Sequence, residues 1–448
     1  MENEWRTSTI GSLCDAGVVE LQTGPFGSQL HAYDYASEGV PVVPTEAIRA
    51  RRIDHSVLPK ISHSKAEELS RHRLRLNDIL FARRGIQATG HIGFVREPEV
   101  GFLCGTGAIR LRVAQNLGAG EVDPDFLSHV LADSASIKWF KFHAIGATMP
   151  NLNEGIIRSF PLRLPPLAEQ RAIAHILNSL DDKVELNRRM SETLEEMARA
   201  LFKSWFVNFD PVRAKMEGRD PGLPSPAADL FPNRLVESEI GEIPEGWNGL
   251  PLTAVIEINP SRSLKKGKLS PYLDMANMPT RGHAPDSVSW RQFGSGMRFT
   301  NGDTLVARIT PCLENGKTAF VDFLDAGQVG WGSTEYLVFR PKPPLPEEFG
   351  YCVARSDEFR EFAVQNMSGS SGRQRVSAAA FDHYHIAMPP RTIAEAFGTS
   401  VQPIFARASA CVREKSALVE LRDALLPKLV SGELRVPEAM KAIEEAAA

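Results

Sequence analysis

The chain repeats itself once, and this duplication constrains its fold more than any other feature of the sequence. Residues 78–83, DILFAR, return as residues 303–308, DTLVAR, at an offset of 225. Three further matches follow in the same order: Phe94-Val95 with Phe320-Val321, Gly105 with Gly332, and Leu164-Pro165-Pro166 with Met388-Pro389-Pro390. Their offsets of 226, 227 and 224 are nearly the same. The sequence therefore predicts two copies of a unit of about 225 residues.

The first part of each copy is predicted to be mixed, strand-rich structure. Residues 91–95, 108–113 and 335–339 alternate apolar and polar side chains, and Gly and Pro separate these segments. The chain has 448 residues, too many for one ordinary domain, and its 43% hydrophobic and 24% charged residues are typical of globular proteins.

Each copy then continues into a long helical segment after its Pro-Pro pair. From Leu167 to about Asn208 there is no proline or glycine, and apolar residues recur every three or four positions, with a polar interruption at Asn187 and Ser191. The second segment, from Ile393 to about Val430, has a poorer stripe. It contains Gly398, Pro403 and Pro427, so a helix broken near both ends is expected there.

Two long helices at equivalent places in a duplicated chain favour pairing with each other, although each could also be an ordinary buried helix. The predicted fold class is α+β, with two strand-rich domains separated by a pair of long antiparallel helices. Between the copies, residues 209–246 carry six prolines and four glycines and are predicted to be a linker without regular elements. The expected divisions are 1–166, first strand-rich domain; 167–208, central helix; 209–246, linker; 247–390, second strand-rich domain; 391–432, C-terminal helix; and 433–448, tail.

Several classes of protein are disfavoured. No run of 18 apolar residues is present, and the first residues show no basic segment followed by an apolar one, so a cytoplasmic location is expected. The five cysteines are scattered and odd in number, which favours free thiols over disulfides or a zinc site.

The usual catalytic motifs are also missing, and a non-catalytic chain is predicted. Gly316-Lys317-Thr318 resembles the end of a P-loop but leads into a predicted strand at residues 319–321, where a helix would be needed. The histidines form no HxxxH or HExxH pattern, so no metal ligands are predicted. Asp181-Asp182-Lys183 has nuclease-like spacing, but in a helix it favours a solvated charged face.

Positive charge gathers around the repeated DxLxAR element. Residues 49–84 hold ten Lys or Arg against four Asp or Glu, and residues 262–317 hold nine against four. A basic face suits a DNA backbone, and the planar fork of arginine can also bind guanine. A solvated surface with local ion pairs remains the alternative for either tract alone.

A second polar cluster precedes each Pro-Pro pair, at residues 146–153 and 368–375. Hydroxyl, amide and guanidinium side chains on glycine-bearing loops are groups that bind base edges and phosphates, although a plain surface loop is nearly as compatible. The candidate DNA-binding residues are Arg83, Arg84, Gln87, Thr89, Thr148, Asn151, Asn153, Arg281, Arg298, Arg308, Lys317, Ser370, Ser371, Arg373, Gln374 and Arg375.

Several motifs in order resemble the DNA-specificity subunit of type I restriction–modification systems. They are LPPLAEQRAI at 164–173, LFKSWF at 201–206, NFDPV at 208–212, GEIPEGW at 241–247 and LRDALLPKLVSGEL at 421–434. The resemblance covers nearly the whole chain. The start of the helix repeats only in part, however. The first copy has Leu-Ala-Glu-Gln-Arg at 167–171, whereas the second has Thr-Ile-Ala-Glu-Ala-Phe at 392–397.

The resemblance implies two target-recognition domains that each bind half of a bipartite DNA site, separated by an antiparallel helical pair. It implies that the chain carries no cofactor and catalyses nothing, while two modification subunits dock on the helices and methylate adenine with S-adenosylmethionine. Restriction subunits that use ATP and Mg²⁺ would complete the nuclease. The rival hypotheses are a free-standing two-domain DNA-binding or scaffold protein without a methyltransferase partner, and an enzyme whose motifs are unfamiliar.

Overall fold

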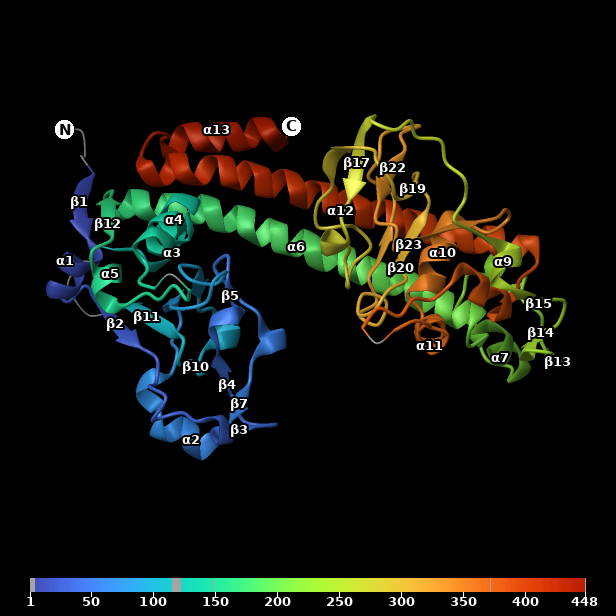
Figure 1. Ribbon diagram of the computed structural model, residues 1–448, viewed down its shortest axis with the longest axis horizontal. Coiled ribbons are helices and arrows are strands. Elements are labelled where there is room, and N and C mark those ends of the chain that lie inside the picture. The colour runs from blue at the N-terminus through green and yellow to red at the C-terminus, as the bar shows by residue number, and fades with distance from the viewer. Residues whose placement is uncertain (1–4, 115–121, 147, 371, 448) are drawn as a thin grey trace. The chain divides into compact units, whose positions relative to one another are not determined.

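The computed structural model describes residues 5–114, 122–146, 148–370 and 372–447, with the backbone alone at 444–447. The chain divides into two compact units. Unit 1 comprises Met1–Lys183 and Ala417–Ala448, and unit 2 comprises Val184–Ser416. The two long helices, α6 (Leu167–Phe206) and α12 (Arg391–Ser431), each contribute one segment to each unit (Figure 1).

Unit 1 is built, in its described residues, from short strands and six α-helices besides the long-helix segments. Its strands are β1 (Arg6–Thr9), β2 (Val19–Thr23), β3 (Tyr35–Ala36), β4 (Val40–Val43), β5 (Ile48–Arg49), β6 (Arg52–Ile53), β7 (Lys60–Ile61), β8 (Ile79–Ala82), β9 (Ile92–Phe94), β10 (Leu103–Cys104), β11 (Ala108–Val113) and β12 (Pro161–Leu164). Its shorter helices are α1 (Ile10–Asp15), α2 (His63–Glu68), α3 (Pro124–Ala132), α4 (Ser134–His143) and α5 (Glu154–Arg158), and α13 (Val436–Ala447) follows α12.

Unit 2 repeats this composition. Its strands are β13 (Leu235–Ser238), β14 (Gly241–Pro244), β15 (Asn248–Pro251), β16 (Ile256–Ile258), β17 (Leu269–Leu273), β18 (Ser289–Gln292), β19 (Met297–Phe299), β20 (Thr304–Ala307), β21 (Thr318–Phe320), β22 (Gly330–Gly332), β23 (Tyr336–Pro341) and β24 (His385–Met388). Its helices are α7 (Asp210–Met216), α8 (Ser225–Ala228), α9 (Leu252–Val255), α10 (Glu347–Ala354) and α11 (Asp357–Gln365).

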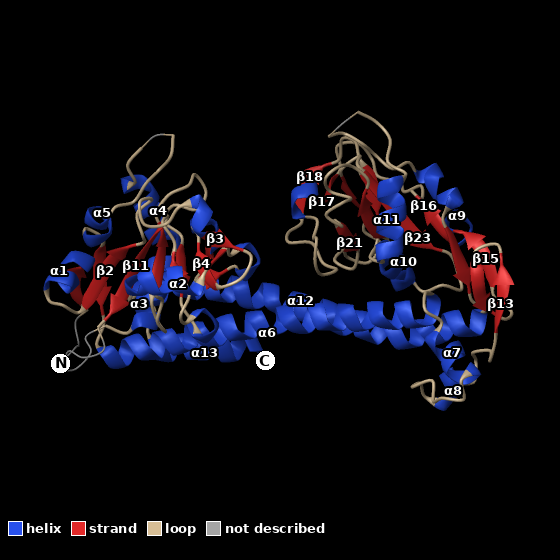
Figure 2. Ribbon diagram, turned by 90° about the horizontal axis from the view of Figure 1, so that it is seen from below, coloured by secondary structure: helices blue, strands red, loops and turns tan. Residues whose placement is uncertain are grey.

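The sheet topology confirms the duplication predicted from the sequence. Unit 1 has a four-stranded antiparallel sheet in the order β2-β11-β8-β9, and unit 2 has its counterpart β16-β23-β20-β21. Each unit also has a second sheet that contains a parallel pair, β4 with β10 and β17 with β22. Figure 2 shows both sets of strands in red. The segments predicted at residues 91–95, 108–113 and 335–339 form β9, β11 and β23, so the predicted α+β fold is confirmed.

The repeated DxLxAR element forms one of the two inner strands of each four-stranded antiparallel sheet. In β8, Ile79 and Phe81 belong to one core cluster while Leu80 and Ala82 belong to another, because successive side chains of a strand point to opposite faces. In β20, Leu305 and Ala307 likewise lie in a different cluster from Val306. A strand buried on both faces tolerates few polar substitutions, which accounts for the apolar residues that recur in the two copies of the element.

The repeated aspartate anchors the turn before this strand. Asp78 is buried and accepts two hydrogen bonds from Arg112, at 2.7 Å and 2.6 Å, and one from the backbone N–H of Arg75. Asp303 is also buried, and it accepts hydrogen bonds from Arg340 at 2.7 Å and from Arg262 at 2.9 Å. A buried carboxylate needs such charged partners, so these arginines are structural.

The long helices run antiparallel in each unit. In unit 1, Asp181 of α6 accepts a hydrogen bond from Arg422 of α12 at 2.9 Å, and Leu177 shares a core cluster with Leu425. In unit 2, the ring of Phe206 lies 4.9 Å from that of Phe397. The predicted stripe of α6 is largely buried, including its polar positions Asn187 and Ser191. Within the described ranges, no helix is both long and apolar enough to cross a membrane.

Two predictions about these helical parts were wrong, those on breaks in the second long helix and on Asp181. Helix α12 runs unbroken through Gly398, Pro403 and Pro427. Burial of its apolar side chains between Phe397 and Leu429 stabilises the helix by more than the loss of a few backbone hydrogen bonds costs. The tail predicted at 433–448 contains α13. Asp181 is 8% exposed, because Arg51 and Arg422 both pair with it, and so does not lie on a solvated face.

The prediction that residues 209–246 hold no regular element was also wrong. They contain α7, α8 and the β13–β14 hairpin, and Phe209 and Phe231 are buried against the end of α6. Pro211 and Pro226 stand in first helical turns, where proline costs no hydrogen bond. The number of prolines suggested a linker, whereas their positions are compatible with short elements.

Candidate nucleic-acid interface

In each unit, backbone hydrogen bonds join two loops that lie far apart in the sequence; we call each such arrangement a loop joint. Arg83, directly after β8, donates its backbone N–H to the Gly107 carbonyl at 2.9 Å and accepts from the backbone N–H of Leu152 at 2.8 Å. In unit 2, Arg308 donates to the Glu335 carbonyl at 3.0 Å and accepts from Val376 at 3.0 Å. The repeated arginine and the polar cluster before Pro-Pro therefore lie together in both units.

Each polar cluster closes on itself in the same way. Asn151 exchanges two backbone hydrogen bonds with Ile145, both of 2.9 Å. Arg375 exchanges two with Ser368, of 2.9 Å and 3.0 Å. Gly146 and Gly369 begin these loops with φ of 105° and 124°, a conformation that favours glycine. By these bonds Asn151 and Arg375 occupy equivalent positions.

The joint of unit 1 combines exposed and supporting polar side chains. The Arg83 Nε donates to Asn151 Oδ1 at 3.0 Å and to the Leu152 carbonyl at 3.1 Å, whereas Arg84 and Gln87 are exposed. Thr89 is buried, and its hydroxyl lies 2.7 Å from the Gly85 carbonyl and 3.0 Å from the Pro150 carbonyl. Thr148 is exposed, and Asn153 accepts from the Ile156 N–H at the start of α5.

The joint of unit 2 is built around a carboxylate. Glu335 accepts hydrogen bonds from Arg375 at 2.8 Å and 2.9 Å and from Arg308 at 3.2 Å. The Arg375 hydrogen bond holds the pKa of Glu335 below its ordinary value, so the group stays ionised. Ser370 and Arg373 are exposed, and Gln374 is half-buried. The predicted contact Ser371 lies outside the described residues.

Glu335 was missed by the sequence reasoning. Its counterpart by the backbone bonds is Gly107, which has no side chain, so the repeat offered no pattern at this position. The one available signal was an acid at the first position of the strand predicted at 335–339, which is too common to be specific.

Three other candidate residues lie outside the joint of unit 2. Lys317 donates to the Met275 carbonyl at 2.7 Å, and the Arg298 guanidinium lies 5.9 Å from the centre of the Phe293 ring. Arg281 is exposed beside a pocket of about 440 Å³ that Glu195 and Arg355 also line. Among the described residues, none of these three side chains contacts Arg308 or Arg375, although the Lys317 carbonyl accepts the backbone N–H of Ala307, next to Arg308, at 3.0 Å.

The basic tracts are only partly surface features. Arg51 is 4% exposed and contacts Asp181 of α6 and Asp125 of α3, at 2.7 Å and 3.3 Å. Burial lowers the pKa of Arg51 to about 10, which leaves it charged. Arg262 pairs with the buried Asp303. The expectation that these tracts form a basic face is therefore corrected in part: Arg51 and Arg262 pair with buried carboxylates and do not face solvent.

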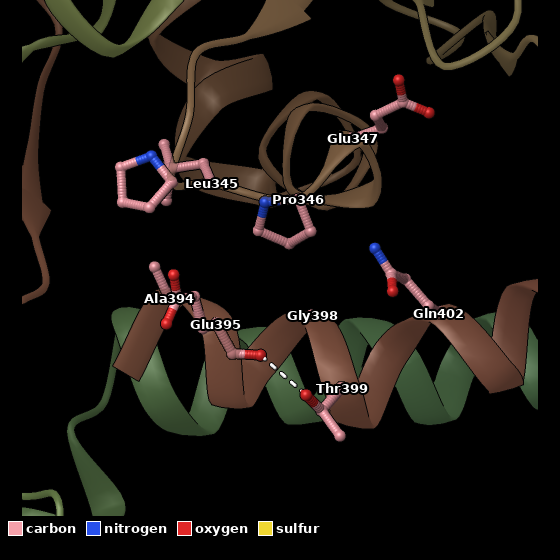
Figure 3. A pocket seen from close by; sticks show the side chains of 9 residues that line it. Leu345, Pro346, Glu347, Ala394, Glu395, Gly398, Thr399 and Gln402 are labelled. Atoms are coloured by element: carbon pink, nitrogen blue, oxygen red, sulfur yellow. Dashed lines mark hydrogen bonds between the residues drawn. The ribbon is translucent and has the colours of Figure 1, made fainter. Parts of the chain in front are cut away.

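The two helix starts differ, as the partial repeat of the sequence suggested. In unit 1, Gln170 is fully buried; its amide oxygen accepts from the Asp123 N–H at 2.8 Å, and its nitrogen donates to the Pro165 carbonyl. In unit 2 the residue before α10 is Pro346, which has no N–H, and Ala394 replaces the glutamine. A pocket of about 450 Å³ lies there, between Pro346 and the first turns of α12 (Figure 3).

Comparison with known proteins identifies this architecture. Residues 2–196 match the family model described as the type I restriction modification DNA specificity domain. Residues 2–196 therefore carry this specificity domain, and the chain as a whole is similar to type I restriction–modification specificity subunits. This confirms the resemblance carried by the motifs at 164–173 and after it.

Relatives of this specificity-subunit family align over most of the chain. The type I restriction enzyme HindI specificity subunit of Haemophilus influenzae is 26% identical over 366 residues, which is 70% of this chain and 78% of that protein. The MjaIX specificity subunit of Methanocaldococcus jannaschii is 23% identical, over 70% of each chain. The crystal structure of the type I restriction–modification S subunit from M. genitalium shares the fold, with a TM-score of 0.55, 16% identity and coverage of 96% and 97%.

Proposed function

We propose that this chain is the DNA-binding subunit of a type I restriction–modification complex, in which each unit recognises one half of a bipartite duplex site. The chain itself carries out no chemistry. Two modification subunits dock on the helices and methylate adenine with S-adenosylmethionine, and restriction subunits that use ATP and Mg²⁺ add the nuclease.

The loop joint is the observation that carries this proposal. It occurs in both units, at the end of an inner strand of each antiparallel sheet, and it unites the two segments that carry exposed Arg84, Gln87 and Thr148 in unit 1 and Ser370 and Arg373 in unit 2. Guanidinium, amide and hydroxyl groups on adjoining loops are suited to base edges and phosphates. The strands behind them are fully buried and provide a rigid support.

Separate support of the two joints favours a bipartite site. Each joint is fixed by hydrogen bonds within its own unit and rests on the core of that unit. The half-sites should therefore be recognised independently, and a substitution in one joint should leave the other half-site unchanged.

The helices offer the surface for the modification subunits. Exposed residues of α6 include Arg171, Arg189 and Glu196, and the pocket beside Ala394 adds a recess lined by Glu347 and Glu395. Because this recess belongs to unit 2 whereas Gln170 is buried in unit 1, the two docking surfaces are expected to differ in detail.

The proposal is tested by co-expressing the chain with its modification subunits and mapping methylated adenines genome-wide. One bipartite sequence is expected. Arg84→Ala and Arg373→Ala should each either lower the salt slope of binding by about one, if the arginine contacts phosphate, or relax one half-site only, if it contacts a base. Arg219→Ala, at an exposed arginine of unit 2 outside the joint, is the control. Methyl transfer by the chain alone, or unchanged binding in both joint variants, would contradict the proposal.

A further inference from the structure

Three apolar side chains are exposed on the loop joint of unit 1. Ile86 is 76% exposed, Ile145 61% and Met149 62%. Ile145 pairs directly with Asn151, and Met149 lies inside the loop that this pair closes. Single exposed apolar side chains need no explanation, but three on one pair of joined loops indicate a surface that binds something.

The joint holds these side chains in place. The hydroxyl of Thr89 lies within hydrogen-bonding distance of both the Gly85 carbonyl, on the turn that carries Ile86, and the Pro150 carbonyl, beside Met149. Since Thr89 is buried, this link is shielded from water. A surface that is already ordered loses little conformational entropy when a partner binds.

The surroundings of these side chains are cationic. Arg84, two residues before Ile86, is exposed. Burial lowers the pKa of His91, and the charges of Lys141 and Arg49 lower it further. An apolar surface among cations fits an anionic partner that presents apolar groups of its own. Duplex DNA presents one such group in its major groove, the C5-methyl of thymine.

Unit 2 lacks this apolar set. The backbone bonds of its joint place Ser368 opposite Arg375, as Ile145 is opposite Asn151. Counting along the same segments, Pro311 corresponds to Ile86 and Arg373 to Met149. The two joints thus share a backbone arrangement but offer different chemistry, guanidinium groups in unit 2 and aliphatic groups in unit 1.

We propose that unit 1 recognises thymine in its half-site through contacts of Ile86, Ile145 and Met149 with C5-methyl groups, whereas unit 2 makes no such contacts. This inference rests on the proposed function and deepens it, because it names the chemical group that one unit distinguishes. It requires no specific hydrogen bond from these residues, only their close approach to the major-groove edge.

The test uses the complex of the chain with its modification subunits and duplexes that carry the mapped site. Replacing thymine by uracil removes the C5-methyl and leaves base pairing and charge unchanged. Unit 1 is assigned the half-site whose sequence specificity decreases in Arg84→Ala, or the half-site whose specificity is unchanged in Arg373→Ala. Uracil there is expected to weaken binding roughly fourfold for each contacted methyl, and uracil in the other half-site should have no effect.

Side-chain truncations provide the second arm. Ile145→Ala and Met149→Ala should weaken binding to the thymine duplex severalfold and should shrink the difference between thymine and uracil duplexes. Val100→Ala, at an apolar residue of unit 1 that is 45% exposed and outside the joint, is the matched control and should keep both the affinity and the difference. Thermal unfolding and co-purification with the modification subunits verify that each variant folds and assembles.

Equal affinity for thymine and uracil duplexes in the unit 1 half-site would overturn the inference. So would variants that lose assembly with modification subunits while they keep full uracil discrimination, since the apolar surface would then bind protein. If the complex recognises no bipartite sequence, the proposed function itself fails. Specific binding without any effect of uracil refutes this inference alone.

Discussion

Arg375 binds Glu335 through two parallel hydrogen bonds, from Nη2 to one carboxylate oxygen at 2.8 Å and from Nε to the other at 2.9 Å. Arg308 contacts the same carboxylate at 3.2 Å. An arginine fork held in this way is oriented but partly neutralised. In unit 1 the corresponding position is Gly107, and Arg83 binds the neutral Asn151 instead.

Glu335→Gln should strengthen the binding of unspecific DNA. The substitution keeps the shape of the side chain but removes the charge that offsets two arginines, so a phosphate gains a stronger partner. We expect roughly threefold to tenfold higher affinity at about 0.1 M salt and a salt slope steeper by about one. Fluorescence titration with random duplex measures both. Glu237→Gln, at an exposed glutamate of β13, is the control, and equal effects of the two variants would argue against a role for the joint.

Asp181→Asn should destabilise unit 1. The carboxylate joins Arg51 and Arg422, and removing one charged partner from a buried group leaves the others uncompensated. A loss of about 3 kcal/mol in the free energy of unfolding is expected. Denaturant unfolding of the full chain measures it. Asp182→Asn removes the neighbouring carboxylate, whose side chain is 70% exposed, and should cost less than about 0.5 kcal/mol. Similar losses in both variants would refute the proposed importance of the buried network.

Gln170→Ala should also destabilise unit 1, because the partly buried Asp123 N–H and the buried Pro165 carbonyl would both lose their hydrogen-bond partner. An unsatisfied buried donor costs about 1–3 kcal/mol. Arg171→Ala, next in the chain and 68% exposed, should be nearly neutral. Ala394→Gln in unit 2 should not produce a matching gain, since Pro346 offers no N–H to the new amide. Thermal melting of the three variants compares these effects.

The stability of unit 1 should fall as the pH decreases below about 6.5. Burial, followed by the charge of Arg51, holds the pKa of His129 well below its ordinary value. The folded state therefore keeps this histidine neutral, whereas the unfolded chain takes up a proton below about pH 6.5, so the stabilisation is present above that pH and is lost below it. One proton contributes at most about 1.4 kcal/mol per pH unit.

The histidine prediction is checked by thermal melting between pH 7.5 and 5.5. His129→Gln retains a polar group toward Asn178 and should show a smaller decline over this range than the unaltered chain. His175→Gln, at an exposed position of α6, should decline as the unaltered chain does. A His129→Gln profile parallel to the unaltered one would remove His129 as the cause.

The duplication allowed much of the fold to be predicted from the sequence. DILFAR and DTLVAR proved to be the inner strands β8 and β20, because a strand buried on both faces leaves a recognisable string of aliphatic residues. The role of Arg51 could not be predicted, since Asp181 lies 130 positions away and no local pattern links them. Glu335 could not be predicted because its counterpart Gly107 has no side chain, so the repeat shows no pattern at this position. The prediction for residues 209–246 was wrong because proline content alone does not distinguish a linker from short helices with proline in the first turn.

The loop joints are fastened by main-chain groups, and this has a consequence for how such a protein can change. Two backbone hydrogen bonds fasten the joints, from the Leu152 N–H to the Arg83 carbonyl and from the Val376 N–H to the Arg308 carbonyl. Because they involve only main-chain atoms, they persist when almost any side chain of the loops is replaced. Met149 or Arg373 can thus be substituted without a change in the backbone hydrogen bonds that hold the loops together. A lineage carrying this gene could acquire a different target for one half while retaining the other, by single mutations that leave folding untouched.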